Sequence, residues 1–401
     1  MENYFSYYLT PIPLNNKINQ HKFHSKSFYL SGNSKKEATI SKTMKILRDL
    51  KPVHILLVFI PLSIIFEYLH MDPLWVFIGS AAAIIPLAKW MGIATEELSF
   101  NLGEGLGGFM NATFGNATEL IIAIFALKRG LVDVVEASIT GSIVSNFLFV
   151  LGVAFLYGGW GKEKQTFNSV AAGTNASLLT IAIMGLVLPA TFSLVRANAE
   201  FIILEEVSIA VAILLMVSYL LSLFFSMRTH KHLYIGGKHG NEDREHARHW
   251  GTNKSLTVLL VATLAVAFMS EMLVGVIEHV AEAAHLSEFF IGVILIPLIG
   301  NAAEHLTAVT VAGKDKMDLA LNIAVGSSTQ IALFVAPLLV FISLIIGHPM
   351  LLVFNELEVV AIAVSVFILD NIVRDGESHW MEGVLLIVSY LIIAIVFFFM
   401  K

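Results

Sequence analysis

The sequence of 401 residues contains no cysteine, and only 14% of its residues are charged. Without cysteine the chain cannot form disulfides, thiolate metal sites or a thiol nucleophile, so the remaining metal ligands are oxygen and imidazole groups. A soluble domain carries about 25% charged residues. This chain is instead 56% hydrophobic, and its net charge of −6 gives no sign of nucleic-acid binding. These values indicate a membrane protein.

Long apolar segments fill the sequence after residue 50. A helix needs about 20 mainly apolar residues to cross the hydrocarbon core, because lipid offers its backbone no hydrogen-bond partner. Eleven such segments predict an all-α integral membrane protein with eleven transmembrane helices. They lie near residues 53–69, 73–94, 106–127, 131–157, 171–190, 201–227, 255–280, 288–312, 317–346, 353–371 and 380–400.

Polar segments divide the chain into parts. Residues 1–50 are rich in Asn, Ser, Lys and His, which is typical of a disordered tail. We expect a first transmembrane helix at 51–71, a five-helix unit at 72–227, a cytosolic linker at 228–253 and a second five-helix unit at 254–401. Lys and Arg concentrate in the loops on the tail's side, so the positive-inside rule places the N-terminus in the cytosol.

The two five-helix units carry the same motif. An offset of 185 residues aligns Gly-Asn-Ala-Thr-Glu at 115–119 with Gly-Asn-Ala-Ala-Glu at 300–304. Because each unit has an odd number of helices, the second enters the membrane from the opposite side, which predicts two inverted repeats. Such repeats are typical of transporters, whose sites lie where the halves meet. The same offset also pairs Gly107 with Gly292, Asp133 with Asp318, Gly141 and Ser142 with Gly326 and Ser327, and Phe149 with Phe334.

Glu119 and Glu304 are the acids of these motifs. A carboxylate at mid-bilayer costs about 2.5–3.5 kcal/mol on insertion scales, so two at matching positions point to a function. Burial and a neighbouring carboxylate favour the protonated acids, whereas a divalent cation favours the ionised pair. Metal and protons therefore compete for the same oxygens, which is the chemistry of exchange. The alternative, that each acid only bridges helices, explains two copies in register less well.

Each motif also supplies an amide. Ca2+ takes about six to eight oxygen ligands and accepts amide and backbone carbonyl groups. Asn116 and Asn301 each precede the motif glutamate by three positions, which predicts amide and acid on one helical face. Gly115 and Gly300 loosen the helices, and an interrupted helix can offer carbonyl oxygens to an ion. The two carboxylates and two amides form the predicted Ca2+ site.

Other polar residues near the motifs have less specific roles. His305, directly after the second acid, suits either proton coupling near neutral pH or ordinary packing. Glu96 and Glu271 stand near predicted helix ends and suit either a gate or a plain surface. The histidines between 230 and 249 suit a solvated linker better than a metal site. A second layer around the ion, or small-residue helix packing, accounts equally for Ser142, Ser145, Asn146, Ser327, Ser328, Thr329 and Gln330.

The motifs Gly-Asn-Ala-Thr-Glu-Leu at 115–120 and Gly-Asn-Ala-Ala-Glu-His at 300–305 resemble the paired signatures of the Ca2+/cation:proton antiporters. The resemblance covers roughly residues 52–401. It implies a sodium/calcium exchanger-like fold, with a first helix followed by two inverted five-helix repeats. It also implies exchange of cytosolic Ca2+ for H+ across a cell or vacuolar membrane, and we favour a prokaryotic cell membrane.

The resemblance extends to individual residues. It implies that Glu119 and Glu304 hold the ion, that Asn116 and Asn301 accompany them, and that His305 takes part in proton coupling. The nearest alternatives are Na+/Ca2+ exchange and K+(Na+)/H+ exchange on the same fold. The related Na+/Ca2+ motif resembles Gly-Thr-Ser-x-Pro-Glu, and neither motif of this chain has its Pro-Glu pair.

Two other classes of function fit less well. A channel is disfavoured by inverted halves and by acids that can hold protons. An intramembrane metalloenzyme is disfavoured because no apolar segment has the spaced histidines of a zinc hydrolase. The sequence therefore predicts a transporter, not an enzyme, that works by alternating access. Its predicted partners are Ca2+, H+ and the lipid bilayer, and it needs no cofactor.

Overall fold

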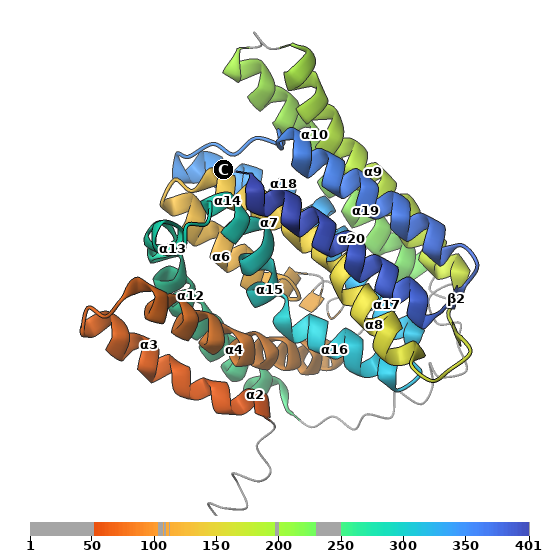
Figure 1. Cartoon of the computed structure of the whole chain (residues 1–401), viewed down its shortest axis with the longest axis horizontal. Helices are drawn as coiled ribbons and strands as arrows, with labels where there is room; N and C mark the ends of the chain where they lie inside the picture. The colour runs from red at the N-terminus through yellow and green to blue at the C-terminus, as the bar shows by residue number, and fades with distance from the viewer. Residues whose placement is uncertain are drawn as a thin grey trace, which may run out of the picture. The chain divides into compact units, whose positions relative to one another are not determined.

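The structure is a computed structural model that describes residues 52–102, 107, 110–111, 113–196, 200–229 and 250–400. The predicted tail and the histidine-rich part of the linker lie outside these residues. Helices make up most of the described chain (Figure 1). The predicted helical membrane protein is therefore confirmed at this level.

The elements before the linker begin with α2 (Pro52–Ile55), η1 (Leu56–Val58), α3 (Phe59–Tyr68) and α4 (Pro73–Leu102). They continue with α6 (Ala117–Lys128), α7 (Val132–Val144), η2 (Ser145–Val150), α8 (Leu151–Gly159), β1 (Gln165–Thr166), α9 (Ser169–Val195), α10 (Phe201–Phe224) and η3 (Phe225–Thr229).

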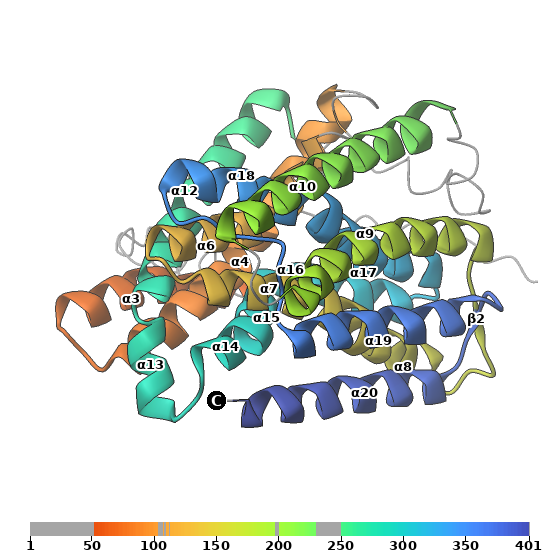
Figure 2. The ribbon, with the colours of Figure 1, turned by 90° about the horizontal axis from the view of Figure 1, so that it is seen from above.

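The elements after the linker begin with α12 (Thr252–Gly275), α13 (Ile277–Ala284), α14 (Glu288–Phe290), η5 (Ile291–Leu295) and α15 (Ile296–Gly300). They continue with α16 (Ala302–Gly313), α17 (Met317–Gln330), η6 (Ile331–Val335), α18 (Ala336–Ile346), α19 (Glu356–Val373), β2 (Glu377–Ser378) and α20 (Trp380–Phe399). α12 lies against α4, and α3 lies against α4 on another side (Figures 1 and 2).

Each predicted apolar segment contains a helix, but several predictions of helix length were wrong. α4 runs to Leu102 rather than ending at 94, and the segment 288–312 is broken into four pieces instead of forming one helix. Within the described residues, seven helical segments are long and apolar enough to cross a membrane. The number is eight if α13 and the helix from Glu288 to Gly300, which meet at a bend of 112°, form one span.

π-helical turns interrupt the helices that follow both motifs. η2 widens the segment between α7 and α8, and η6 widens the segment between α17 and α18. η2 and η6 occupy overlapping positions when the first half is aligned with the second at the offset of 185 residues. π-helical turns occur frequently at functional sites.

Glycines allow α7 and η5 to pack almost backbone to backbone. A Cβ atom on Gly141 would lie 1.9 Å from the carbonyl oxygen of Val293. A Cβ atom on Gly292 would lie 2.8 Å from Cβ of Ala137. Small residues permit such close approach between membrane helices, where dispersion contacts replace the hydrophobic effect. This crossing joins the first half of the chain to the second.

Three loops from both halves meet on one face of the protein. β1 and β2 form an antiparallel pair in which Gln165 opposes Ser378. Lys162 binds Asp315 at 2.8 Å, and Lys164 binds Glu377 at 2.5 Å. The hydrogen bond to Glu377 and the charge of that carboxylate raise the pKa of Lys164 above its ordinary value. The loops 160–168, 313–317 and 374–379 therefore lie on the same side.

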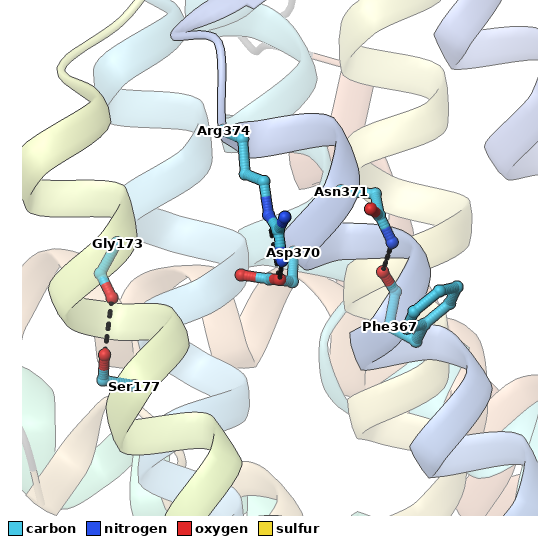
Figure 3. Close-up of polar contacts among 6 residues, drawn as sticks. All are labelled: Gly173, Ser177, Phe367, Asp370, Asn371 and Arg374. Carbon is cyan, nitrogen blue, oxygen red and sulfur yellow. Dashed lines mark hydrogen bonds and ion pairs between the residues drawn. The ribbon is translucent and has the colours of Figure 1, made fainter.

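Three polar contacts near the ends of α9 and α19 lie within single helices (Figure 3). Ser177 donates to the carbonyl oxygen of Gly173, and Asn371 donates to that of Phe367. Arg374 binds Asp370 at 2.6 Å, one turn away. These contacts satisfy polar groups locally and do not join neighbouring helices.

The close crossing of α7 and η5 makes a prediction about two equivalent glycines. Gly141→Ala should lower the free energy of unfolding by about 3 kcal/mol, because the new methyl group overlaps the Val293 carbonyl oxygen. Gly326→Ala should be neutral or stabilising by up to about 1 kcal/mol, because no described atom lies within 4 Å of its Cβ position. Thermal unfolding in detergent measures both, and equal melting temperatures would contradict this packing.

Candidate functional site

The two motif glutamates occupy the same position in two short helices. Glu119 lies in the first turn of α6, and Glu304 lies in the first turn of α16. The positive end of a helix dipole favours negative charge at this position. A Cβ atom on Gly300 would lie 3.3 Å from Cγ and Oε1 of Glu119, so this side chain rests on the second motif. The two carboxyl groups are close enough to interact electrostatically.

Each helix starts immediately after the motif asparagine. Asn116 has φ −101° and ψ 24°, and Asn301 has φ −89° and ψ 4°, which are not the angles of a regular helix. Each asparagine is therefore the N-cap residue of its helix, and its carbonyl oxygen accepts the first helical hydrogen bond, from Leu120 and from His305 respectively. That amide and acid share one face stays a prediction. The helix breaks at the motif in both halves, as the motif glycines suggested.

Both asparagines bond to side chains of the opposite half. Ser327 donates to Oδ1 of Asn116 at 3.1 Å, and Asn301 donates through Nδ2 to Oγ of Ser142 at 3.2 Å. The two contacts are related by the 185-residue offset of the motifs. Asn116 also donates to Oε1 of Gln330 at 2.5 Å. Both asparagines are fully buried, so these bonds hold the two motifs together inside the protein.

Several oxygens at this junction are buried without a hydrogen-bond donor. They are Oε2 of Glu119, Oε2 of Glu304 and Oδ1 of Asn301. Leaving such atoms unpaired is costly, and for a charged oxygen the cost is larger. A small pocket borders Glu119, Ser142 and Pro297. Protons or a cation would satisfy these oxygens.

The predicted second layer of polar residues divides into two groups. Ser142, Ser327 and Gln330 bond across the halves, as described above. Ser145 donates to the carbonyl oxygen of Ser142, and Thr329 donates to that of Val325, so their hydroxyl groups bond within their own segments. Ser328 does the same, with the carbonyl oxygen of Ala324.

His305 contacts a residue of the first half. Its Nε2 lies 3.1 Å from Oδ1 of Asn146, which belongs to the π-helical segment η2. Both side chains are buried, and the Phe149 ring lies 6.5 Å from the imidazole, edge to face. His305 thus borders the glutamate site but belongs to a separate hydrogen-bonded pair.

Glu96 and Glu271 lie on α4 and α12, and both side chains are exposed. Glu97, next to Glu96, accepts a hydrogen bond from the backbone of Trp250 at 3.2 Å. This contact fixes the end of the linker, just before α12, to α4.

A second pair of acids, outside the repeated motifs, was not predicted from the sequence. Glu358 is 1% exposed and accepts hydrogen bonds from Thr140 at 3.0 Å and from the backbone of Asn355 at 2.9 Å. Glu136 lies one turn before Thr140 and interacts electrostatically with Glu358. The signal was present, because both acids lie in apolar segments and an acid within a membrane helix is unusual.

The model of the family described as sodium/calcium exchanger protein matches residues 73–228 and 254–399. The chain belongs to this family. The Ca2+/H+ antiporter of Aphanothece halophytica is 48% identical over 358 residues, which are 86% of this chain and 95% of the relative. The Ca2+/H+ antiporter of Synechocystis is 47% identical over 358 residues, 86% of this chain and 96% of the relative.

A solved structure agrees with these matches. The structure of native YfkE has a TM-score of 0.75 and 41% identity, and the match covers 86% of this chain and 99% of that one. The family predicted from the paired motifs is confirmed. The relatives are named as antiporters rather than enzymes, which also confirms the prediction of a transporter that is not an enzyme.

The bond between Asn116 and Gln330 makes a prediction about coupling. Gln330→Ala and Asn116→Ala should each lower the melting temperature, because each leaves a buried polar partner unpaired. The double variant should lose about 1 kcal/mol less free energy of unfolding than the two single losses added together. Thr329→Val serves as a control, because Thr329 bonds within its own helix. Additive losses for Asn116 and Gln330 would contradict the bond.

Proposed function

We propose that this protein exchanges Ca2+ for H+ across a membrane as a secondary active transporter. The observation that carries the proposal is the pair of buried carboxyl oxygens, one on Glu119 and one on Glu304, that have no hydrogen-bond donor. The names of the relatives as Ca2+/H+ antiporters support the choice of ions.

The two glutamates and the motif amides would bind either cargo. With Ca2+ bound, both carboxylates are ionised, and Oδ1 of Asn301 is a further oxygen ligand without a competing donor. Water and the backbone carbonyls at the helix breaks complete the oxygen set. Without Ca2+, protons neutralise the carboxyl groups. An empty, doubly charged site is too costly inside the membrane for the halves to rearrange around it.

The proposed architecture has eleven transmembrane helices, with a first helix at 51–71 and inverted repeats at 72–227 and 254–401. Three features that occur in both halves support it. They are the helix breaks at the motifs, the matching π-helical segments η2 and η6, and the reciprocal bonds of Asn116 with Ser327 and of Asn301 with Ser142. Alternating access would follow from rearrangement of these halves about the site.

The proposed orientation places the N-terminus in the cytosol. The loops at 160–168, 313–317 and 374–379 carry Lys and Arg and meet on one face, which would be the cytosolic face. Relatives from two cyanobacterial sources support a prokaryotic cell membrane. His305 would assist proton coupling from its place beside Glu304.

Removing either charge tests the proposal. Glu119→Gln and Glu304→Gln should each abolish uptake of radioactive Ca2+ into vesicles with an imposed pH gradient, because a neutral amide can neither release a proton nor balance the cation. Glu206→Gln, at an exposed acid on α10, should leave uptake unchanged and serves as the matched control.

Size-exclusion chromatography in detergent should show that all three variants fold like the unmodified protein. Uptake that survives in both motif variants would refute the assignment. If a Na+ gradient drove uptake and a pH gradient did not, the ion exchanged for Ca2+ would be Na+ rather than H+.

A further inference from the structure

Two buried tyrosines pack in the same way on the two π-helical segments. Tyr390, on α20, lies against Phe149 in η2, with ring centroids 5.2 Å apart. Tyr219, on α10, lies against Phe334 in η6, with ring centroids 5.3 Å apart. Phe149 and Phe334 are equivalent at the offset of 185 residues. The same aromatic contact is therefore made in both halves of the protein.

Each of these contacts joins one half to the other. α20 belongs to the second half and packs against η2 of the first, and it also runs along α8, the helix that continues η2 (Figure 1). α10 belongs to the first half and packs against η6 of the second. Each π-helical segment is thus held by a helix of the opposite half.

The π-helical segments adjoin the amides that bond to the two motifs. Asn146 lies within η2 and contacts His305, and Gln330 directly precedes η6 and bonds to Asn116. A shift in the backbone of either segment therefore moves an amide that holds a motif residue.

The hydroxyl groups of the two tyrosines are not explained by this packing. Tyr219 and Tyr390 are 4% and 5% exposed, and neither hydroxyl has a hydrogen-bond partner among the described residues. A buried tyrosine hydroxyl usually has such a partner, and leaving it without one is costly. Phenylalanine would supply the same aromatic contact without this cost. Two unpaired hydroxyls at reciprocal places therefore point to a partner that each gains in another conformation.

A π-helical segment can supply that partner. In a π-helix each carbonyl oxygen is bonded to the N–H five residues later, whereas in an α-helix it is bonded to the N–H four residues later. A change between these registers breaks the first bond before the second forms, so a carbonyl oxygen loses its donor. The tyrosine packed on the segment carries a donor that no other described group uses.

We propose that Tyr219 and Tyr390 are positioning residues for the glutamate site, and that each hydroxyl donates to a carbonyl oxygen freed when its π-helical segment changes register. The proposal rests on the alternating access proposed above, because the halves must rearrange about the motifs. The unpaired hydroxyl raises the free energy of the present conformation, and its new bond lowers that of the changed one. Both effects shift the equilibrium toward the change.

Hydrogen–deuterium exchange of the full chain tests each segment separately. Tyr390→Phe removes only the hydroxyl, and it should slow amide exchange in residues 145–151 about tenfold, because the N–H that leaves a carbonyl oxygen is the one that exchanges. Exchange in residues 331–336 should not change. Tyr219→Phe should give the reverse pattern, so each variant is the matched control for the other.

Transport and stability should change in opposite directions. Each variant should raise the melting temperature, because a buried unpaired hydroxyl is removed, and should lower the maximal rate of Ca2+ uptake about fivefold. The KM for Ca2+ should change less than about twofold, because the glutamates and their amides are intact. Tyr157→Phe, at a tyrosine on α8 that is 62% exposed, should change none of these values.

Two results would overturn the proposal. One is unchanged amide exchange in the segment that faces the altered tyrosine. The other is a lower melting temperature with an unchanged rate of uptake, which would show that the hydroxyl is already bonded, for example to a trapped water. Amide exchange needs no cargo, so it stays readable if the unmodified protein shows no uptake driven by a pH gradient and the proposed function fails.

Discussion

The structure depends on one electrostatic constraint, which is that two carboxyl groups inside a membrane need a neutralising partner. Glu119 and Glu304 lie at the starts of two short helices that exist because the chain breaks at Asn116 and Asn301. The breaks turn the asparagine amides toward the opposite half, where serine and glutamine side chains bind them. The protein thus pairs the amide nitrogens itself and leaves Oε2 of both glutamates and Oδ1 of Asn301 without a hydrogen bond.

The packing around this site differs between its two sides. η5 lies on α7 through glycine contacts, whereas Leu319 and Asn322 at the equivalent positions of α17 are exposed. A repeated sequence therefore does not produce two identical environments. The residues that differ between the copies, such as Ala137 and Asn322 or Leu120 and His305, are where the two sides acquire different properties.

The parts that repeat were the easiest to predict from the sequence. The paired motifs identified the family and marked both glutamates and both asparagines as candidates, because an internal copy at fixed spacing stands out. The bonds of Ser142 and Ser327 to the asparagines were not predicted, since small polar residues in a membrane helix suit packing equally well. Each motif also lay inside a segment predicted to be continuous, and only the fold shows that a helix starts between Asn116 and Glu119.

Tertiary contacts account for the other errors. Glu358 is buried because α7 supplies Thr140 to its carboxyl group, and nothing in the local sequence of α19 reveals that neighbour. The extra length of α4 has a similar origin, since its last turns are held by contacts with Trp250 at the end of the linker. Hydrophobic segments alone mark the apolar part of a helix and not its end.

Ion pairs between the loops 160–168, 313–317 and 374–379 also link the two halves. Lys162 with Asp315 and Lys164 with Glu377 lie in water, where dissolved ions screen charge over about 8–10 Å at ordinary ionic strength. The amide and serine bonds at the motifs are buried and largely escape this screening. The ion pairs between the halves therefore weaken as the salt concentration rises, whereas the buried bonds between the halves do not.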